Sequence, residues 1–355
     1  MTSISILIFL ISMLAVSFLS AASNYLGLID TPCSRKAHKG KIPLVGGIAV
    51  FTGSSVGIML TFEYSLFSSL FIIASSLMVF IGVLDDKYNL SVRSRLIGQF
   101  LVSSILVFGL NTYLSSLGNI IFGIDVELAQ FGIIFTYLAI IGAINAFNMV
   151  DGIDGLLGGV GCNALLGVAV LCYLAGNEYL FKYALIIIVA MLPYLLANLR
   201  IWPFSQKKIF MGDAGSMFIG LVVVWLIVFG TQDTFLGEKS FNPVTALYLV
   251  ALPLMDMVAI MFRRIKKKQS PFKPDRNHIH HIFMRAGLSD RQALVILCLL
   301  SLTIMLVGIT IELIGFSEWL SLLIFLGIFM IFNLMINHAW VVVKFIRKFS
   351  SKGEI

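Results

Sequence analysis

Long apolar segments recur along the whole chain, and they constrain the possible folds more than any other feature. A helix that crosses the hydrocarbon core of a bilayer needs about 20 mostly apolar residues. The sequence therefore predicts an all-α, polytopic transmembrane helical bundle with about eleven spanning helices, forming one domain over residues 1–355. The division between the second and third spans is the least marked, because only residues 63–65 separate them. The predicted spans are 3–22, 45–62, 66–84, 96–113, 129–147, 156–175, 181–199, 214–231, 243–262, 292–313 and 319–343.

The composition excludes a water-soluble globule. Hydrophobic residues make up 59% of the chain and charged residues only 12%, against about 25% in soluble domains. The mean hydropathy is +0.99. We expect the first span to be a retained helix and not a cleaved signal, because no Lys or Arg precedes Arg35. The cysteines form no CxxC pair and fall mostly inside predicted spans, so we expect small buried residues and no disulfide framework.

The basic residues fall almost entirely on one side of the predicted bundle. With eleven crossings, alternate loops share a side, and one set holds all of the 25 Lys and Arg residues except Lys182 and Lys239. Basic loops stay in the cytoplasm, so we expect the N-terminus outside and the C-terminus in the cytoplasm. The same rule accounts for the net charge of +7, and nucleic-acid binding is not needed to explain it. The basic set comprises residues 23–44, 85–95, 148–155, 200–213, 263–291 and 344–355.

The first polar motif on the cytoplasmic side is a pair of carboxylates, Asp85 and Asp86, at the inner end of a predicted span. Adjacent carboxylates at a membrane boundary repel each other and resist desolvation unless a cation or a proton relieves them. A divalent metal or the nearby Arg93 and Arg95 would supply that relief. The alternative is an ordinary solvated helix end.

The second motif places polar residues at intervals of three, at Asn145, Asn148, Asp151 and Asp154. Each step of three drifts by about 60° around a straight helix, so Asn148 and Asp151 share a face that Asn145 and Asp154 cannot both join. Glycines at positions 152 and 155 offer the break that would bring Asp154 back. Asn and Asp oxygens are hard ligands suited to Mg²⁺. The alternative is a polar seam between helices followed by a turn.

The third motif is the segment FMGDAGS at 210–216, directly before a predicted span. Asp213 stands where a helix N-cap would be, and capping is the alternative to a functional role. The glycines on either side would let a phosphate or a metal approach the backbone closely, which favours function.

The fourth motif lies in the most basic loop, where histidines cluster beside arginine and lysine. The surrounding positive charge argues against a transition-metal site and favours donors for phosphate oxygens. The alternative is a juxtamembrane basic segment on anionic membrane lipids, which accounts for the lysines but not for the histidines. The candidate residues are Arg276, His278, His280 and His281.

Two further features have weaker implications. The basic loop at 30–47 is mainly a topology signal, with phosphate contact as the minor interpretation. In the ninth predicted span, Pro253 is expected to kink the helix, and the kink could form a groove for a long lipid. Asp256 in that span is close to Arg263 and Arg264 in sequence, and we expect it to snorkel to the helix end or to pair there with one of these arginines.

Together, the motifs favour phosphoryl transfer between a soluble nucleotide and a lipid phosphate. Oxygen ligands for Mg²⁺ lie beside Arg, Lys and His donors at one membrane surface. Two anionic reactants repel, so metal and basic groups must neutralise both while aligning them. The alternative from another class is a membrane transporter with an acidic site, but the centres of the spans are nearly uncharged and no internal repeat is visible.

The motifs and their order resemble the polyprenyl-phosphate N-acetylhexosamine-1-phosphate transferase family. The segments that carry the resemblance are DDKYNL, NAFNMVDGIDGL, FMGDAGS and PDRNHIHH, and it extends over essentially the whole chain. The HIHH ending resembles the HexNAc-1-phosphate branch more than the branch that transfers phospho-MurNAc-pentapeptide. The resemblance implies a bacterial inner-membrane enzyme with a periplasmic N-terminus and an active site that faces the cytoplasm.

The resemblance also implies a role for each matching residue. Asp213 and Asn148 match the family's Mg²⁺ ligands, with Mn²⁺ as a substitute metal. Asp85 and Asp86 match the pair that handles the lipid phosphate, and Asp85 is a candidate base that acts as much through electrostatics and positioning. The matching catalytic positions at the nucleotide end are Asp151 and Asp154. The residues implied in phosphate and nucleotide binding are Arg95, Asn145, Arg276, His278, His280 and His281.

The implied reaction transfers GlcNAc-1-phosphate from UDP-GlcNAc to undecaprenyl phosphate and gives undecaprenyl-diphosphate-GlcNAc and UMP. It would start a lipid-linked surface polysaccharide, either O-antigen or enterobacterial common antigen. The same reaction with another UDP-HexNAc is the alternative. Direct in-line attack by the lipid phosphate is the preferred mechanism, with a covalent aspartyl intermediate as the other route. The implied partners are the two substrates, membrane lipids and a second copy of the chain in a homodimer.

Overall fold

The computed structural model describes residues 2–31, 40–270 and 278–338, and nearly all of the regular secondary structure in these ranges is helical. This confirms the all-α prediction. The strands are a two-residue pair, β1 (Ile29–Asp30) and β2 (Ile42–Pro43), which pair antiparallel. The helices are α1 (Thr2–Leu26), α2 (Gly46–Thr61), α3 (Leu66–Tyr88), α4 (Val92–Ser104), the π-helix η1 (Ile105–Gly109), α5 (Phe131–Val150), α6 (Leu156–Leu174), α7 (Glu178–Asn198), α8 (Gly212–Thr231), α9 (Pro243–Leu249), α10 (Ala251–Lys266), α11 (Ile279–Arg285), α12 (Asp290–Ile314) and α13 (Glu318–Asn337).

Each of the eleven predicted spans has a helical counterpart, although two of them differ from a simple crossing. Within the described residues, 9 helices are long and apolar enough to span a membrane. The helix α2 has only 16 residues, which corresponds to about 24 Å against a hydrocarbon core of about 30 Å. The pair α9 and α10 forms a broken span, bent by 84°. The chain is therefore a multi-pass membrane protein.

The bend between α9 and α10 confirms the kink predicted from Pro253, with a shift in its position. Proline cannot donate to the carbonyl four residues earlier and its ring clashes with that carbonyl. The break accordingly falls between Leu249 and Ala251, before the proline and not at it. The prediction that Asp256 pairs with Arg263 or Arg264 is wrong. Those arginines lie about 10 Å further along the helix axis, and the carboxylate instead contacts His278.

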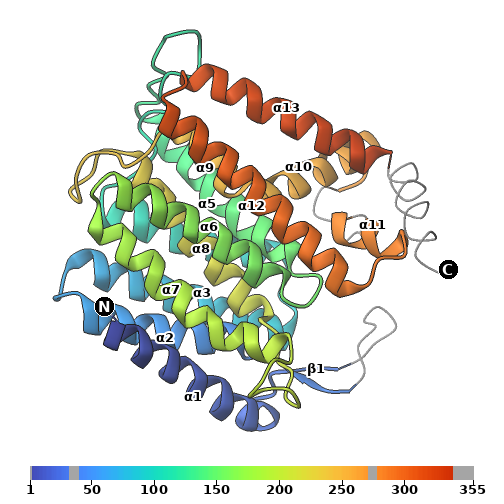
Figure 1. Cartoon of the computed structure of the whole chain (residues 1–355). Helices are drawn as coiled ribbons and strands as arrows, with labels where there is room; N and C mark the ends of the chain where they lie inside the picture. The colour runs from blue at the N-terminus through green and yellow to red at the C-terminus, as the bar shows by residue number, and fades with distance from the viewer. Residues whose placement is uncertain (1, 32–39, 271–277, 339–355) are drawn as a thin grey trace.

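The helix α8 forms the centre of the bundle. Its apolar window is completely buried, and it packs against α2, α3, α5 and α6, as Figure 1 shows. Close packing depends on glycine at two positions. A Cβ at Gly47 would lie 2.2 Å from Cα of Gly215, and a Cβ at Gly82 would lie 2.3 Å from Cα of Ala214. The backbones of α2 and α3 therefore clamp the first turn of α8.

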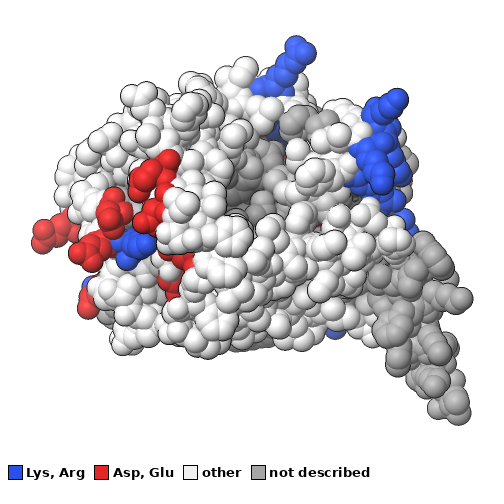
Figure 2. Space-filling view, turned by 90° about the horizontal axis from the view of Figure 1, so that it is seen from above, with Lys and Arg blue, Asp and Glu red and all other residues white. Residues whose placement is uncertain are grey.

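Successive spans alternate in direction, with α4 and η1 forming one span and α9 and α10 another, so the connections between spans gather at two ends of the bundle. We call the end with residues 29–31, 40–45, 89–91, 151–155, 199–211, 267–270 and 278 the site end, and the end with residues 62–65, 110–130, 175–177, 232–242 and 315–317 the far end. In Figure 2 most of the visible Lys and Arg atoms lie toward the right of the face, while the Asp and Glu atoms lie at the left with a few basic atoms among them. This agrees with the one-sided distribution of basic residues, and the cytoplasmic location of the basic end stays a prediction.

Candidate active site

The carboxylate of Asp86, at the end of α3, caps the N-terminus of α8. Its Oδ1 accepts the backbone N–H of Asp213 at 2.9 Å, and its Oδ2 accepts that of Ala214 at 3.2 Å. Free N–H groups and the helix dipole make such a helix start favourable for a negative charge. Gly212 has a φ of +73°, and a Cβ there would lie 2.6 Å from Oδ2 of Asp86. The sequence allowed Asp213 itself to be the N-cap of α8, but Asp86 caps this helix instead. The side chain of Asp213 is therefore available for another contact.

The predicted metal ligands Asp213 and Asn148 are in direct contact. The Nδ2 of Asn148 donates to Oδ1 of Asp213 at 2.6 Å and to Oγ of Ser216 at 2.8 Å. Asn148 lies in the last turn of α5, and the other two residues lie in the first turns of α8. The packing of α5 on α8 thus joins the second and third sequence motifs.

The turn between α5 and α6 confirms the predicted break in the Asn/Asp ladder. The helix ends at Val150, and Gly155, with a φ of +77°, immediately precedes α6. Asn198 at the end of α7 holds this turn, because its Oδ1 accepts the N–H of Gly155 at 2.6 Å while its Nδ2 donates to the carbonyl of Ile209 at 2.7 Å. Asp154 emerges from the turn and forms an ion pair with Lys208 at 2.6 Å.

Asp151 is the first residue beyond α5 and carries a perturbed carboxyl. Its side chain touches solvent, but dense surrounding protein weakens its hydration. This desolvation is the main cause that raises the pKa of Asp151 to about 7, and the charges of Asp213 and Asp154 add to it. The last two causes show that the carboxylates of the second and third motifs repel one another.

Asp85 differs from its neighbour Asp86 because a basic side chain offsets its charge. Its Oδ2 lies 3.1 Å from Nη1 of Arg95, and its Oδ1 accepts the N–H of Leu90 at 2.8 Å. Arg95 thus stands at the site end with its guanidinium on Asp85. Its predicted contact with a pyrophosphate, and the predicted role of Asp85 toward a lipid phosphate, stay predictions.

The histidine motif meets the turn after α5. A Cβ at Gly152 would lie 2.2 Å from Nε2 of His280, so the glycine makes room for the ring. Burial, followed by the neighbouring His281 and His278, lowers the pKa of His280 to about 3. His280 is therefore neutral at pH 7 and can offer a phosphate one hydrogen bond but no charge. The ring of His281 lies 4.2 Å from that of His280, and Arg276 lies outside the described residues.

Asn145 is directed toward α4. Its Nδ2 donates to Oε1 of Gln99 and to the carbonyl of Ile141, both at 2.8 Å. These contacts match the alternative of a polar seam between helices. Contact of Asn145 with a nucleotide stays a prediction.

The segment before α2 also reaches the site. Phe210 donates its N–H to the carbonyl of Pro43 at 2.8 Å, and the N–H groups of Gly46 and Gly47 donate to the carbonyls of Phe210 and Met211, each at 2.9 Å. The end of the 30–47 loop therefore fixes the chain that leads into Asp213. Residues 32–39 of that loop lie outside the described ranges.

The site has more negative than positive charge near its centre. Among the described residues, no Lys, Arg or His lies within 4 Å of the carboxylates of Asp86, Asp151 or Asp213. Nor do any three described His, Cys, Asp or Glu side chains form a ready metal cluster. Mg²⁺ is commonly held by one or two carboxylates with water and substrate phosphates completing its shell. The oxygens of Asp213 and Ser216 fit such an ion, and Asn148 would join them with its Oδ1 once its amide turns over from the orientation in which Nδ2 donates to both.

Sequence reasoning missed three residues that shape this site. Ser216 is part of the third motif but was not assigned a role. Lys208 and Asn198 carry only weak sequence signals, a lysine two residues before that motif and an isolated asparagine at the end of an apolar span. Their contacts depend on which helices become neighbours.

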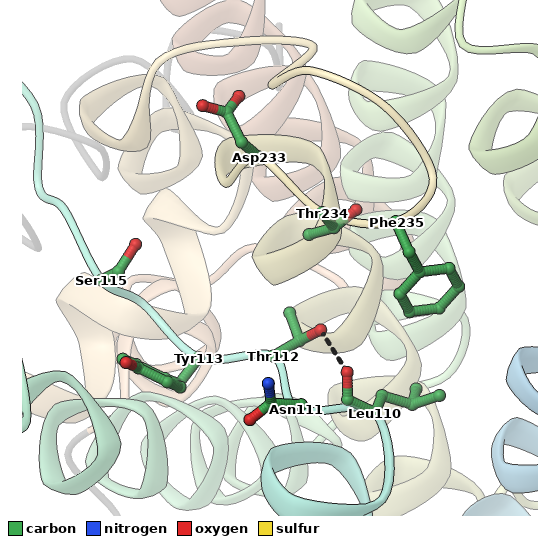
Figure 3. A pocket seen from close by; sticks show the side chains of 8 residues that line it. All are labelled: Leu110, Asn111, Thr112, Tyr113, Ser115, Asp233, Thr234 and Phe235. Atoms are coloured by element: carbon green, nitrogen blue, oxygen red, sulfur yellow. Dashed lines mark hydrogen bonds between the residues drawn. The ribbon is translucent and has the colours of Figure 1, made fainter.

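Two cavities lie at the far end, away from these motifs. The first, of about 450 Å³, is lined by residues of the 110–115 and 233–235 segments, and Figure 3 shows Asp233 above it and Tyr113 and Asn111 below. The second, of about 560 Å³, shares Leu110, Asn111 and Phe235 with it. The predicted site residues that the structure describes line neither cavity.

Comparison with known proteins agrees with this grouping of motifs. The sequence model of glycosyl transferase family 4 matches residues 68–231, which include the first three motifs. A Yersinia pestis protein is 41% identical over 98% of this chain and 94% of its own length. An Escherichia coli O157:H7 protein is 43% identical over 96% and 92%, and a Haemophilus influenzae protein is 37% identical over 98% and 97%. All three are named undecaprenyl-phosphate alpha-N-acetylglucosaminyl 1-phosphate transferase. Similarity of this extent shows that the chain belongs to glycosyl transferase family 4.

Proposed function

We propose that this chain transfers GlcNAc-1-phosphate from UDP-GlcNAc to undecaprenyl phosphate and releases UMP. The observation that carries the proposal is similarity at 37–43% identity along nearly the whole chain to relatives named for that transfer. Because the alignment covers the membrane helices as well as the polar motifs, it supports the same reaction and not only the same fold.

The reaction exchanges one phosphoanhydride for another. An oxygen of the lipid phosphate attacks the phosphorus that carries the sugar, a P–O bond forms there, and the P–O bond to UMP breaks. UMP leaves with the bridging oxygen and its electron pair. A phosphate monoester is already ionised at pH 7, so the attack needs little help from a base. The protein's contribution is alignment and neutralisation of charge.

The residues at the site end supply parts suited to this task. Asp213 and Asn148 would hold Mg²⁺, which when bound neutralises phosphate charge and orients the reactants. Arg95 and Lys208 place positive charge at the edges of the carboxylate group. Neutral His280 offers a donor beside Gly152, the residue after Asp151. Asp86 contributes indirectly, because its cap fixes the first turn of α8 on which Asp213 lies.

The site end is proposed to face the cytoplasm of a bacterial inner membrane, where UDP-sugars are found. The support is the concentration of Lys and Arg in the loops of that end. The product would begin a lipid-linked surface polysaccharide, either O-antigen or enterobacterial common antigen. Orientation can be measured by placing single cysteines at Ser91 and at Ser240 in a cysteine-free protein. Membrane-impermeant maleimide should label position 240 from outside the cell and position 91 only after permeabilisation.

The test of the reaction uses purified protein in lipid nanodiscs with undecaprenyl phosphate, MgCl₂ and a panel of UDP-HexNAc donors. UMP release and a new lipid-linked product are measured together. We expect both with UDP-GlcNAc, and neither when the lipid phosphate or the metal is left out. Product formation only with a different UDP-HexNAc would change the sugar but keep the reaction class. Failure with every donor would reject the proposal.

A further inference from the structure

Asp256 is a buried carboxylate that the proposed reaction does not use. It lies in α10, and its relative exposure is 0%. Acidic residues in membrane-spanning segments are rare and strongly unfavourable unless they are paired, and those that persist usually serve a function. The contacts of Asp256 therefore indicate what that function is.

Both oxygens of Asp256 contact the start of α11. Oδ2 lies 2.8 Å from Nδ1 of His278, and Oδ1 accepts the backbone N–H of Ile279 at 3.1 Å. An ionised carboxylate can only accept, so Nδ1 of His278 must carry a hydrogen. When the ring is neutral, this leaves Nε2 as the acceptor atom on the opposite edge. One carboxylate thus sets the tautomer of the histidine and the position of the first helical residue.

His278 is connected to the turn that begins with Asp151 through the ring of His280. The rings of His278 and His280 lie 5.7 Å apart and are nearly parallel, with an interplanar angle of 5°. The ring of His280 in turn occupies the space beside Gly152, where a Cβ would lie 2.2 Å from Nε2. The chain of contacts therefore runs from α10 through α11 to the end of α5.

Apolar packing alone would not fix this arrangement. The helix α11 has 7 residues and buries Ile279, Ile282 and Phe283. Hydrophobic contact is non-directional, so it holds the helix against the bundle without specifying the rotation of the residue before it. The hydrogen bonds from Asp256 are directional, and they act on the end of the helix where the histidines lie.

We propose that Asp256 is a positioning residue for the transferase site. It holds His278 with the hydrogen on Nδ1 and fixes the start of α11, so that the ring of His280 lies beside Gly152 in the 151–155 turn. The proposal rests on the proposed function for the identity of the substrate, and it places the effect of Asp256 at the sugar-nucleotide side. Asp256 touches no reacting atom and acts through His278.

A double-mutant cycle tests this dependence in the full-length protein in nanodiscs. The variants are Asp256→Asn, His278→Ala and the two combined. We expect each single change to lower kcat/KM for UDP-GlcNAc by about tenfold, while KM for undecaprenyl phosphate stays within about twofold. If Asp256 acts through His278, the double variant is no worse than His278→Ala. The proposal would be overturned if the double variant lost the product of the two single-variant losses in kcat/KM. It would also be overturned if Asp256→Asn impaired the use of both substrates equally or had no effect.

A second measurement needs no turnover. ¹⁵N-histidine NMR at about pH 9, above the usual histidine titration range, reports which ring nitrogen carries the hydrogen. We expect Nδ1 in the wild type and Nε2 in Asp256→Asn, because the new amide donates to Nδ1. The same tautomer in both proteins would contradict the positioning role. If the wild-type protein releases no UMP, the proposed function is rejected. The tautomer of His278 would still show whether Asp256 positions this histidine.

Glu312 in α12 provides a matched control. It too is a carboxylate that accepts a backbone N–H, that of Asn242 at 3.1 Å, together with the hydroxyl of Thr245. These contacts lie at the far end. Glu312→Gln should leave both KM values and the tautomer of His278 unchanged, even if it lowers Tm. A loss of UDP-GlcNAc use equal to that of Asp256→Asn would show that the cycle reports only general destabilisation.

Discussion

The polar side chains at the two ends of the bundle are partnered in opposite ways. At the far end, Oε1 of Gln232 accepts the N–H groups of Ser115 and Ser116 at 3.0 and 3.1 Å, and its Nε2 donates to the carbonyl of Ser116 at 3.0 Å. Glu312 likewise bridges Asn242 and Thr245. Each of these side chains ties one segment to another, and the protein itself supplies the partners.

At the site end, carboxylates face one another. Asp86 is stabilised by backbone N–H groups and Asp85 by Arg95. Asp151 and Asp213 have no basic partner within 4 Å among the described residues, and each opposes the charge of the other. Desolvated like charges reduce stability. An arrangement that lowers stability and yet brings carboxylates together from three separate segments, α3, the 151–155 turn and α8, points to a ligand that supplies the missing positive charge.

The contrast predicts that removing a charge lowers kcat but not Tm at the site end, and lowers Tm but not kcat at the far end. The largest effect on kcat is expected at Asp213. Asp213→Asn should lower kcat by at least about 100-fold, the scale for loss of one preorganised electrostatic group. The Tm of the metal-free protein should stay or rise. The lost helix-dipole interaction is worth about 0.3–1 kcal/mol, and relief of repulsion from the neighbouring carboxylates offsets it. UMP release and thermal unfolding in EDTA measure both quantities.

Glu312→Gln is the corresponding change at the far end. It should lower Tm, because a satisfied buried acceptor is weakened, and it should leave kcat within about twofold. If Asp213→Asn keeps near-normal magnesium-dependent turnover, or if the two variants lose activity equally, the distinction between the ends is wrong.

The second prediction concerns the clamp that places the first turn of α8. Gly47→Ala adds a Cβ that would lie 2.2 Å from Cα and N of Gly215. Overpacking of this kind costs about 1–3 kcal/mol, and displacement of Asp213 by even a fraction of an ångström should lower kcat by about tenfold or more. Denaturation curves and initial rates provide the measurement.

Gly142→Ala is the matched control for Gly47→Ala. Gly142 lies in α5, in a helical segment like that of Gly47, but nothing lies within 4 Å of the added Cβ. Alanine has the higher helix propensity, so stability should stay or rise slightly, with unchanged rates. Equal loss of activity in both variants would show that the clamp on α8 does not matter for the reaction.

A smaller effect is expected from Asn198→Leu. This change leaves the N–H of Gly155 and the carbonyl of Ile209 without their side-chain partner. Each unsatisfied buried group costs about 1–3 kcal/mol, and the loosened turn should lower kcat/KM for UDP-GlcNAc by about five- to tenfold. Kinetics measured below the unfolding temperature separate the two effects.

Asn163→Leu provides the comparison for this variant. Asn163 donates to the carbonyl of Cys298 at 2.9 Å, within the membrane region and outside the motifs. It should reduce stability without changing kcat/KM. A normal kcat/KM for Asn198→Leu would mean that the 151–155 turn does not depend on α7.

The sequence was sufficient to predict which end of each helix carries the chemistry. Antiparallel crossings force the loops to alternate, so Asp86, Asp151 and Asp213 had to appear at one end once the spans were assigned. The break at Gly152 and Gly155 was predictable for the same local reason, since a straight helix could not align the ladder.

The contacts that organise the site were not predictable, because they join helices whose adjacency the sequence does not state. The cap that Asp86 gives α8 depends on the packing of α3 on α8. The pair of Asp256 with His278 depends on α11, which packs against α12, bringing its first residues to α10. A pattern of apolar residues shows that a helix is buried without naming its neighbour. The position of the bend before Pro253 could have been derived from the carbonyl clash alone.

The smallest expected effect follows from the carboxyl of Asp151, and it tests whether the repulsion at the site end is real. In the unfolded chain this group ionises near its ordinary value of 3.8, whereas desolvation by the surrounding protein and the charges of Asp213 and Asp154 raise its pKa to about 7 in the folded protein. Between these values the folded state holds the extra proton, so stability falls as pH rises and the loss is complete above about pH 7. In EDTA, Asp151→Asn should therefore raise Tm by a few degrees at pH 8 and by less at pH 5.

Magnesium should reduce the repulsion between the carboxylates of the site end by neutralising their charge. A cation that binds ionised carboxylates stabilises the folded protein in proportion to how many are ionised. MgCl₂ should therefore raise the Tm of the wild type more at pH 8 than at pH 5, and it should reduce the advantage of Asp151→Asn. At the far end, removal of the exposed pair of Glu178 and Lys182 should change neither response. If Asp151→Asn lowers Tm at pH 8 in EDTA, the folded protein already stabilises this carboxylate, and the two ends of the bundle do not differ in the way described.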